Sequence, residues 1–476
     1  MTWAAGFVPA TRLLGLLAAT LLALLAVAIP AAAQDPASAL DTGDTAWVLM
    51  ASALVMLMTP GLALFYAGMV RAKNAVGTLM QCLAVMGLIT LQWVVLGYTL
   101  AFGPDVGGLI GGLDFAFLRD VSAVEPNAAY APTIPHQAFM IFQMMFAIIA
   151  PALILGAVAE RVKFGAVVAF VLLWATFVYD PIAHWVWGVG GWLRALGGLD
   201  FAGGLVVHVS AGVAALACAL YLGRRLGHGR EEMGPHNLTL TVLGAGLLWF
   251  GWFGFNGGSA VASGSLATVA FVNTHIATAA AALAWTLIEW RRRGKPSALG
   301  AANGAVAGLV AITPACGFVT PLAAIAVGAG AGGLCYLAVR LKDRLGLDDA
   351  LDAWGVHGVG GIWGAVATGL FASAAVNAVG TDGALLGNLR LLGVQLAGVL
   401  AVAVYTFAVT WALLWGIDRT IGLRVAPEHE EVGLDVTQHG ETAYNFPLVA
   451  AVVAVPVAEA PEGSVTAQAV ASHDGA

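Results

Sequence analysis

The chain has 476 residues, of which 60% are hydrophobic and only 10% are charged, and its formal net charge is −7. A water-soluble domain of this composition would have too few polar side chains to cover its surface. The negative charge and the lack of a basic patch argue against a nucleic-acid-binding protein. Together with 61 glycines, which let helices approach closely in lipid, the composition predicts an integral membrane protein.

The first segment has the pattern of an export signal. Arg12 precedes an apolar run over residues 13–29, and the small residues Ala31 and Ala33 fit cleavage after Ala33. We therefore expect residues 1–33 to be a signal peptide, with the mature N-terminus outside the cytoplasm. The alternative interpretation is a retained first membrane span.

Eleven further apolar stretches are long enough for membrane-spanning helices of about 20 residues. They cover residues 44–69, 75–102, 136–158, 164–187, 204–222, 237–255, 264–290, 298–314, 320–340, 353–373 and 391–418. The sequence therefore predicts an all-α membrane domain over residues 34–421, followed by a tail over 422–476.

The basic residues predict the orientation of these helices. With the N-terminus outside, the cytoplasmic loops and the start of the tail carry sixteen of the twenty Lys and Arg residues. Because cytoplasmic loops are enriched in basic residues, we expect a multi-pass protein of the inner (plasma) membrane, with its N-terminus outside and its C-terminus cytoplasmic.

Aromatic residues gather at the predicted outer ends of three helices. Phe142 and Phe146 lie in the third helix, Trp187 ends the fourth, and Trp252 and Phe255 lie near the end of the sixth. A belt of interfacial aromatics is one explanation. The other is a cage that attracts a cation through ring faces, with Ser259 adding a hydrogen-bond acceptor.

Asp200 precedes the fifth helix, in the segment GGLDFAGG. The plain interpretation is an N-cap, since Asp accepts hydrogen bonds from free N–H groups at a helix start. A capping carboxylate would also lower the cost of a nearby cation, although we do not expect Asp200 to touch the substrate.

Two histidines, His208 in GGLVVHVSAG and His357 in WGVHGVGGIWG, lie within the predicted fifth and tenth helices. An ionisable side chain at membrane depth indicates a functional site. If helices 6–10 repeat helices 1–5, the odd number five makes the repeats inverted, with the substrate path at their interface. The eleventh helix is then an extra element, and the two imidazoles could relay protons.

Eight segments, in order across residues 44–445, form a distinctive set. They are AERVKF, PIAHWVWG, LDFAGGLVVH, GWFGFNGGSA, FVNTHIATAAAAL, GKPSALGAANGAVAGLVAITPACG, GVHGVGGIWG and GLRVAPEHEEVGLDVTQHGETAYN. On these segments the chain resembles the ammonium transporter (Amt/Mep/Rh) family, specifically its bacterial Amt branch. Residues after Asn445 have no counterpart in the family pattern.

The resemblance implies a homotrimer with one substrate pore through each subunit, and it implies roles for individual residues. Phe146, Trp187 and Ser259 are similar to an outer recruitment site, and Phe146 and Phe255 to a stacked phenyl gate. His208 and His357 resemble a twin-histidine pair, Asp200 a structural acid, and Phe142 and Trp252 flanking aromatics. For the tail, the resemblance implies docking on cytoplasmic loops, regulation, and a cytoplasmic PII signalling protein as a partner. We expect the acidic segment of the tail to lie close to the basic loops with Arg224, Arg225 and Arg291 to Arg293.

Physical chemistry favours the same function. An intact ammonium ion loses its hydration in an apolar pore at a cost of many kcal/mol, whereas neutral ammonia loses far less. We therefore expect recruitment of ammonium, or its analogue methylammonium, followed by deprotonation and conduction of ammonia. Whether the proton crosses separately through the imidazoles stays open.

Two other classes of function compete with a transporter. An ammonium sensor would signal through the cytoplasmic tail, but no kinase, phosphodiesterase or receiver-like segment follows the last helix. A redox or metal enzyme would use His208 and His357 as ligands, but metal sites usually add Cys, Asp or Glu, and neither histidine has such a neighbour within one helical turn. The four cysteines lack metal-ligand spacing and are interpreted as packing residues. No enzyme activity, cofactor or metal is expected.

Overall fold

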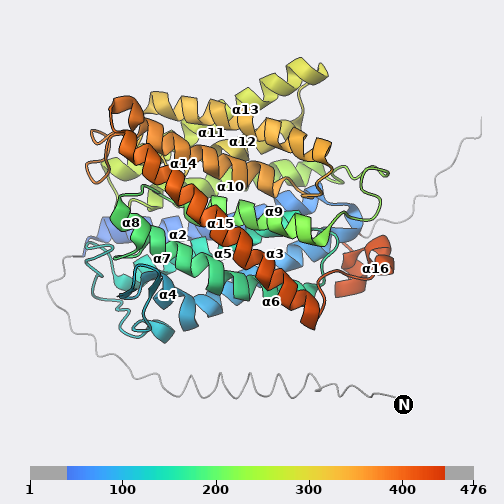
Figure 1. The fold of residues 1–476 in the computed structure, drawn as a ribbon, viewed down its shortest axis with the longest axis horizontal. Coiled ribbons are helices and arrows are strands. Elements are labelled where there is room, and N and C mark those ends of the chain that lie inside the picture. Colours follow the sequence, from blue (N-terminus) through green and yellow to red (C-terminus); the bar gives the residue numbers. More distant parts are fainter. Residues whose placement is uncertain (1–39, 445–476) are drawn as a thin grey trace, which may run out of the picture.

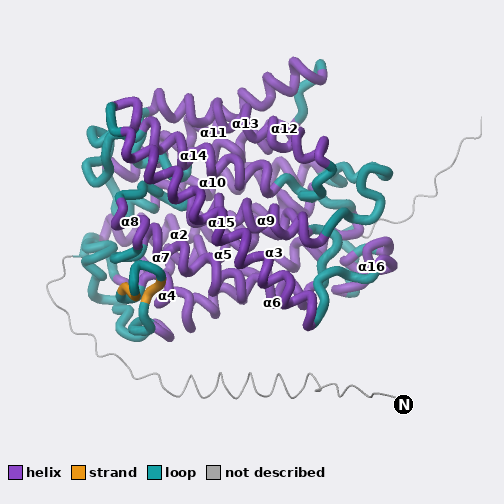
Figure 2. The backbone as a smooth tube through the Cα atoms, viewed as in Figure 1, coloured by secondary structure: helices purple, strands orange, loops and turns teal. Residues whose placement is uncertain are grey.

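The computed structural model describes residues 40–444, which form a bundle of long helices with loops gathered at its two ends (Figures 1 and 2). The predicted signal peptide lies outside the described residues, as does the tail after Tyr444. Only one small antiparallel sheet, β1 paired with β2, occurs within the described part. The all-α fold class predicted from the sequence is confirmed.

The helices and strands follow the predicted order closely. They are α2 (Thr42–Met69), η1 (Ala72–Asn74), α3 (Ala75–Gln92), η2 (Trp93–Gly97), α4 (Tyr98–Phe102), β1 (Asp105–Val106), β2 (Ile110–Gly111), η3 (Ala116–Leu118), α5 (His136–Val158), α6 (Phe164–Trp174), η4 (Ala175–Tyr179), α7 (Asp180–Trp187), α8 (Trp192–Leu196), η5 (Gly204–Val209), α9 (Ser210–Leu222), α10 (Leu238–Gly258), α11 (Ser265–Arg293), α12 (Ala298–Ile312), α13 (Pro321–Leu345), η6 (Trp354–Gly358), α14 (Val359–Phe371), η7 (Ala384–Leu386), α15 (Leu389–Thr420), α16 (Pro427–Val432) and η8 (Asp435–His439).

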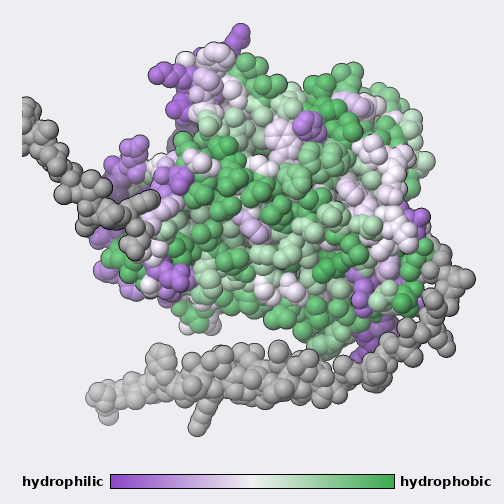
Figure 3. Space-filling model, turned by 180° about the vertical axis from the view of Figure 1, so that it is seen from behind, coloured by the Kyte–Doolittle hydropathy of each residue, from purple (hydrophilic) through white to green (hydrophobic). Residues whose placement is uncertain are grey.

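Nine of the helical segments between residues 40 and 444 are long and apolar enough to cross a membrane. The shorter apolar helix α12 and the run formed by η6 and α14 occupy the two remaining predicted positions. The count of eleven spans therefore stays a prediction. On the face seen in Figure 3, apolar side chains cover most of the middle, and hydrophilic ones gather toward the two ends, as expected where lipid is the solvent.

The packing repeats between the two halves of the chain. In the first half α2 packs against α5, and α5 against α9. In the second half α10 packs against α12, and α12 against α14. The two halves meet along α2 and α10, while α15 runs diagonally across α9 and α14 (Figure 1). Corresponding helices of the two halves thus make corresponding contacts, while the inversion of the repeat stays a prediction.

The two histidine helices cross at glycines placed symmetrically. A methyl group on Gly212, four residues after His208, would lie 2.1 Å from the backbone nitrogen of Gly358, next to His357. A methyl group on Gly361, four residues after His357, would lie 3.0 Å from Cβ of His208. Only glycine permits this approach, so the crossing fixes the spacing of the two imidazoles.

The structure differs from the predicted continuous helices at several π-helical turns. η2, η4, η5 and η6 each widen one turn inside a predicted span. Hydrophobic periodicity does not reveal such turns, because the apolar pattern continues through them. Two of these π-turns contain His208 and His357. Because π-turns frequently occur at functional sites, their positions agree with a functional role for the two histidines.

We predict that Gly212→Ala lowers the free energy of unfolding by about 1–3 kcal/mol, the usual cost of overpacking. The added methyl group has to separate η5 and α9 from η6. The matched control is Gly87→Ala in α3, where a methyl group meets no atom within 4 Å. The apparent melting temperature of purified protein measures the effect. Equal melting temperatures for the two variants would contradict the tight crossing.

Candidate functional site

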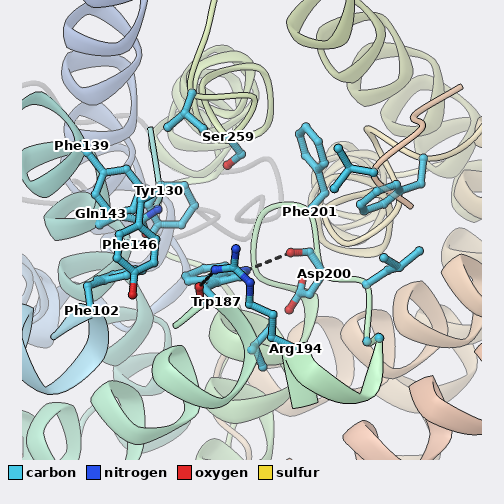
Figure 4. Close-up of a pocket in the computed structure, with 17 residues that line it drawn as sticks. Phe102, Tyr130, Phe139, Gln143, Phe146, Trp187, Arg194, Asp200, Phe201 and Ser259 are labelled. Atoms are coloured by element: carbon cyan, nitrogen blue, oxygen red, sulfur yellow. Dashed lines mark hydrogen bonds between the residues drawn. The ribbon is translucent and has the colours of Figure 1, made fainter. Parts of the chain in front are cut away.

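A cavity of about 400 Å³ opens at the end of the bundle that carries α8 and the β1–β2 hairpin. Figure 4 shows side chains from several helices pointing into it. The predicted recruitment residues lie on its wall, together with aromatic and polar neighbours. The lining includes Phe102, Tyr130, Phe139, Gln143, Phe146, Trp187, Arg194, Asp200, Phe201, Ser259 and Phe318.

Three residues predicted as a group meet in this outer cavity. The rings of Phe146 and Trp187 are nearly perpendicular, with centroids 5.9 Å apart. The hydroxyl of Ser259 donates to the carbonyl of Phe255 at 2.8 Å, which leaves its oxygen free to accept a hydrogen bond. Ring faces and a free oxygen acceptor form a neutral environment suited to a small cation.

Asp200 lines the same cavity but has its oxygens occupied. Oδ1 accepts from the backbone N–H groups of Gly203 and Gly204, at 2.8 and 2.6 Å, and Oδ2 accepts from Leu205 and Val206, at 2.7 and 3.3 Å. The backbone carbonyl of Asp200 accepts from Trp187 Nε1 at 2.9 Å. Asp200 therefore caps η5 and holds Trp187 in place, as the capping interpretation predicted.

Two phenyl rings close the floor of the cavity. The centroids of Phe146 and Phe255 lie only 4.3 Å apart, and both side chains are buried. Phe142 packs edge-on against Phe146 at 4.9 Å. The rings separate the outer cavity from the interior, so any substrate that passes requires them to move.

The two histidines lie directly beneath the phenyl pair. Their rings are nearly parallel, with centroids 5.4 Å apart, and the two Nδ1 atoms are separated by 3.4 Å. Trp252 stacks on His208 at 5.4 Å and donates from Nε1 to Thr313 Oγ1 at 2.9 Å. Both imidazoles are buried, and Nε2 of His208 has no protein partner.

Two small cavities continue the line inward from the phenyl pair. Each has a volume of about 10 Å³, close to the space that one water molecule needs. Phe255, His208 and His357 line the first, among Met, Leu, Ile and Val side chains. His357 also lines the second, with Asn303 and Asp352. The cavities mark a narrow, mostly apolar path through the bundle.

Some residues at the site were not singled out from the sequence. Tyr130 and Gln143 line the outer cavity, although Gln143 stands between the two predicted phenylalanines. Asp349 accepts hydrogen bonds from the N–H groups of Ala353 and Trp354 at the start of η6. Asp349 precedes His357 by eight residues, as Asp200 precedes His208. This shared spacing in the two halves of the chain could have identified Asp349 from the sequence.

A buried ionic network surrounds the other end of the path. The guanidinium of Arg225 binds the carboxylate of Asp348 at 2.8 Å, and that of Arg161 donates to the Asp348 carbonyl at 2.7 Å. Burial would raise the pKa of the Asp348 carboxyl, but the hydrogen bonds from Arg225 and the charge of Arg161 outweigh burial and bring it to about 2. Asp348 therefore stays ionised and anchors the loop before η6.

Residues 422–444 of the tail pack against loops at this end. The N–H of Val425 bonds to the carbonyl of Arg161 at 3.0 Å, and Asp435 accepts from the N–H of Gly77 at 2.7 Å. Lys73 donates to the carbonyls of Glu430 and Glu431. This segment is docked rather than solvated.

The basic partners of the tail differ from those we expected. Arg224 and Arg225, near which the acidic tail was predicted to dock, instead bind the loop before η6, through the Gly346 carbonyl and Asp348. Arg293 pairs with Glu289 of its own helix. Glu430 is held by Arg424, within the tail itself, and by the N–H of Leu226. Much of the docking uses backbone groups, which charge patterning cannot reveal.

No cluster of three or more His, Cys, Asp or Glu side chains that could hold a metal ion occurs between residues 40 and 444. All four cysteines lie within this range, buried and unpaired, in agreement with their interpretation as packing residues. The site itself contributes aromatic rings, imidazoles, and hydroxyl, amide, guanidinium and carboxylate groups.

Comparison with known proteins gives a consistent result. A family model described as the Ammonium Transporter Family matches residues 46–444. The chain is 50% identical over 406 residues to an ammonium transporter of Bacillus subtilis, covering 85% of this chain and 99% of that one. It is 47% identical over 405 residues to ammonium transporter Amt1 of Archaeoglobus fulgidus, covering 85% and 100%.

Solved structures agree with the sequence matches. The crystal structure of Saccharomyces cerevisiae Mep2 superposes with a TM-score of 0.77 at 39% identity, covering 82% of this chain and 91% of that one. A sensor Amt protein superposes with the same TM-score at 32% identity, covering 83% and 98%.

Proposed function

We propose a mechanism of ammonium transport for this chain, which belongs to the Ammonium Transporter Family. The protein is a multi-pass membrane transporter and not an enzyme. In the proposed mechanism the outer cavity recruits ammonium, a proton is removed, and ammonia passes the phenyl pair and the twin histidines. The observation that carries this proposal is the continuous line from the outer cavity through Phe146 and Phe255 to His208 and His357.

The outer cavity suits capture and release of a cation. The ring of Trp187 and the Ser259 oxygen are available to ammonium, while the carboxylate of Asp200 is already bonded to four N–H groups. A cation–π contact contributes about 0.5–2 kcal/mol. Binding of this strength concentrates ammonium or methylammonium without trapping it.

The path beneath the phenyl pair suits a neutral molecule. Its first small cavity is lined by apolar side chains apart from the two imidazoles. An ion there would lose several kcal/mol of hydration with no countercharge, whereas ammonia is neutral and can both accept a hydrogen bond through its lone pair and donate through its N–H bonds. We infer that deprotonation precedes passage.

The imidazole pair is suited to guide ammonia and to relay protons. At 3.4 Å between the Nδ1 atoms, one ring has to donate and the other to accept, so a neutral pair shares one hydrogen between these atoms. The ring nitrogens directed away from this contact are then left for ammonia. Transfer of a proton along the pair would add charge movement to ammonia transport.

We further propose the domain boundaries, the membrane orientation and the oligomeric state of the transporter. Residues 1–33 are a cleaved signal, residues 34–421 are the transport domain in the inner membrane, and the C-terminus is cytoplasmic. Exposed apolar helix faces in Figure 3 allow assembly into a homotrimer, with one pore in each subunit.

Residues 422–476 are proposed to be a regulatory tail. The docked segment contacts the Arg161 loop, and Arg161 in turn binds Asp348, next to the Asp349 cap of the His357 helix. A cytoplasmic PII signalling protein is proposed to act at this end of the pore. The alternative function, an ammonium sensor that signals through the tail, gains support from the similarity to a sensor Amt protein.

We predict that replacing both His208 and His357 by leucine abolishes the current evoked by an ammonium pulse on a solid-supported membrane. The leucines remove both imidazoles from the first small cavity. The matched control is His275→Leu, an exposed histidine on α11, which should keep the current. An unchanged current from a correctly assembled double variant would exclude the proton relay.

We predict that Trp187→Leu weakens the apparent affinity for ammonium by the loss of a contact of about 0.5–2 kcal/mol. Competition by other cations should increase as well. The control, Trp192→Leu, removes a neighbouring aromatic that is absent from the cavity wall. Equal affinity in both variants and the wild type would make Trp187 only an interfacial anchor.

We predict that deleting residues 422–476 lowers transport and leaves the pore intact, whereas deleting 446–476 has a far milder effect. The longer deletion removes the contacts with Arg161, Lys73 and Gly77. Currents are compared at equal surface expression. Full activity after the longer deletion would show that docking has no regulatory role.

A further inference from the structure

A second buried polar cluster lies outside the histidine path, between α3 and the junction of η4 and α7. It consists of Asp180, Gln92, Thr176 and Tyr179, which we call the Asp180 cluster. Asp180 and Tyr179 are completely buried. Asp180 precedes Trp187 by seven residues, or about 10 Å along a helix axis, so the cluster lies inward of the outer cavity. The proposed transport mechanism assigns it no role.

The hydrogen bonds of the Asp180 cluster are incomplete. Gln92 Nε2 donates to Asp180 Oδ2 at 2.8 Å and to Thr176 Oγ1 at 3.1 Å. Three buried polar atoms have no protein partner: Asp180 Oδ1, Gln92 Oε1 and the Tyr179 hydroxyl. Buried polar atoms are nearly always satisfied, so three orphans in one cluster indicate a binding role.

No positive charge balances Asp180 within the described part of the chain. The ionisable groups on neighbouring helices and loops have partners of their own, and no ion pair of residues 40–444 includes Asp180. Tyr98 bonds to His136 at 2.5 Å, His184 to Asp105 at 2.9 Å, Tyr405 to the Phe177 carbonyl at 2.7 Å, and Arg194 to the Trp187 carbonyl at 2.5 Å.

The helices on both sides of the cluster depart from regular α-helical hydrogen bonding. The N–H of Asp180 bonds to the carbonyl of Ala175, five residues earlier, which makes the π-turn η4. Pro181 has no N–H, so the Phe177 carbonyl lacks its helical partner and accepts from Tyr405 instead. The π-turn η2 begins directly after Gln92 and packs against η4. Two π-turns, which often mark functional positions, thus meet at this cluster.

We propose that Asp180, Gln92 and Tyr179 form a proton-binding site, separate from the histidine pair, with the proton held on Asp180 Oδ1 at neutral pH. A carboxylate with one hydrogen bond and no cation would cost several kcal/mol at this depth. A proton on Oδ1 removes the charge and provides a donor for the unpartnered Oε1 of Gln92, whose Nε2 already bonds to the same carboxyl group. A proton is also the smallest ligand and requires no cavity.

The site is placed to exchange its proton with the outer cavity. Asp180 begins α7 and Trp187 ends it, and Trp187 and Asp200 both line the outer cavity. When the ionised Asp180 carboxylate is reprotonated, one O–H bond forms on Oδ1. One N–H bond of ammonium, or one O–H bond of hydronium, breaks to give ammonia or water. The choice of ammonium as the proton donor rests on the proposed transport function, whereas the proton-binding site itself and hydronium as donor do not.

Infrared spectroscopy of the full-length protein in lipid, without ammonium, tests the site directly. At neutral pH the wild type should show the carbonyl stretch of a protonated carboxyl group, sensitive to exchange in heavy water. Asp180→Asn, which keeps the shape of the side chain, should lose this band. The control Asp114→Asn, on an exposed outer loop, should retain it. A band that is absent from the wild type, or unchanged in Asp180→Asn, would overturn the proton-binding site.

Ammonium-pulse currents recorded across a range of pH test the exchange. The pH profile of Asp180→Asn should shift relative to the wild type, whereas that of Asp114→Asn should not. A wild-type profile in Asp180→Asn would overturn exchange with the outer cavity. Failure of the transport function would be distinguishable, because the wild type would then give no ammonium current while the infrared measurement still reports on Asp180.

Discussion

The exclusion of charge from the interior is the constraint on which the structure of the path depends. The first cavity beneath the phenyl pair is lined by apolar side chains apart from the imidazoles, and an ion without countercharge loses several kcal/mol of hydration there. The outer cavity can be polar and wide because it is open, whereas the inner cavities are narrow. The proposed division between a cation site outside and a neutral path inside follows from this cost.

The same constraint explains how the helices around the path begin. Asp200 and Asp349 each accept backbone N–H groups at the start of a π-turn that carries a histidine. These carboxylates satisfy helix ends that would otherwise be buried without partners, and they do so away from the histidine contact. Gly212 and Gly361 then let the two helices cross closely enough for the imidazoles to come into contact.

Much of this arrangement was predictable from the sequence. Hydropathy placed the helices, and the ionisable residues His208 and His357 were visible because they interrupt apolar segments. The resemblance to ammonium transporters then identified the candidate positions of Phe146, Trp187 and Ser259. The π-turns were not predictable, because the apolar pattern runs through them unchanged. The docking of the tail through backbone groups, and the pairing of Gln92 with Asp180, depend on tertiary contacts that no local pattern encodes.

The protonation of the two histidines tests the central claim most directly. Solid-state nitrogen NMR of protein with labelled histidine, in lipid at neutral pH, distinguishes neutral rings from imidazolium, and single histidine variants assign the signals. A charge-free path predicts that His208 and His357 are both neutral, with Nδ1 protonated in one ring and bare in the other. An imidazolium signal from either residue would contradict it.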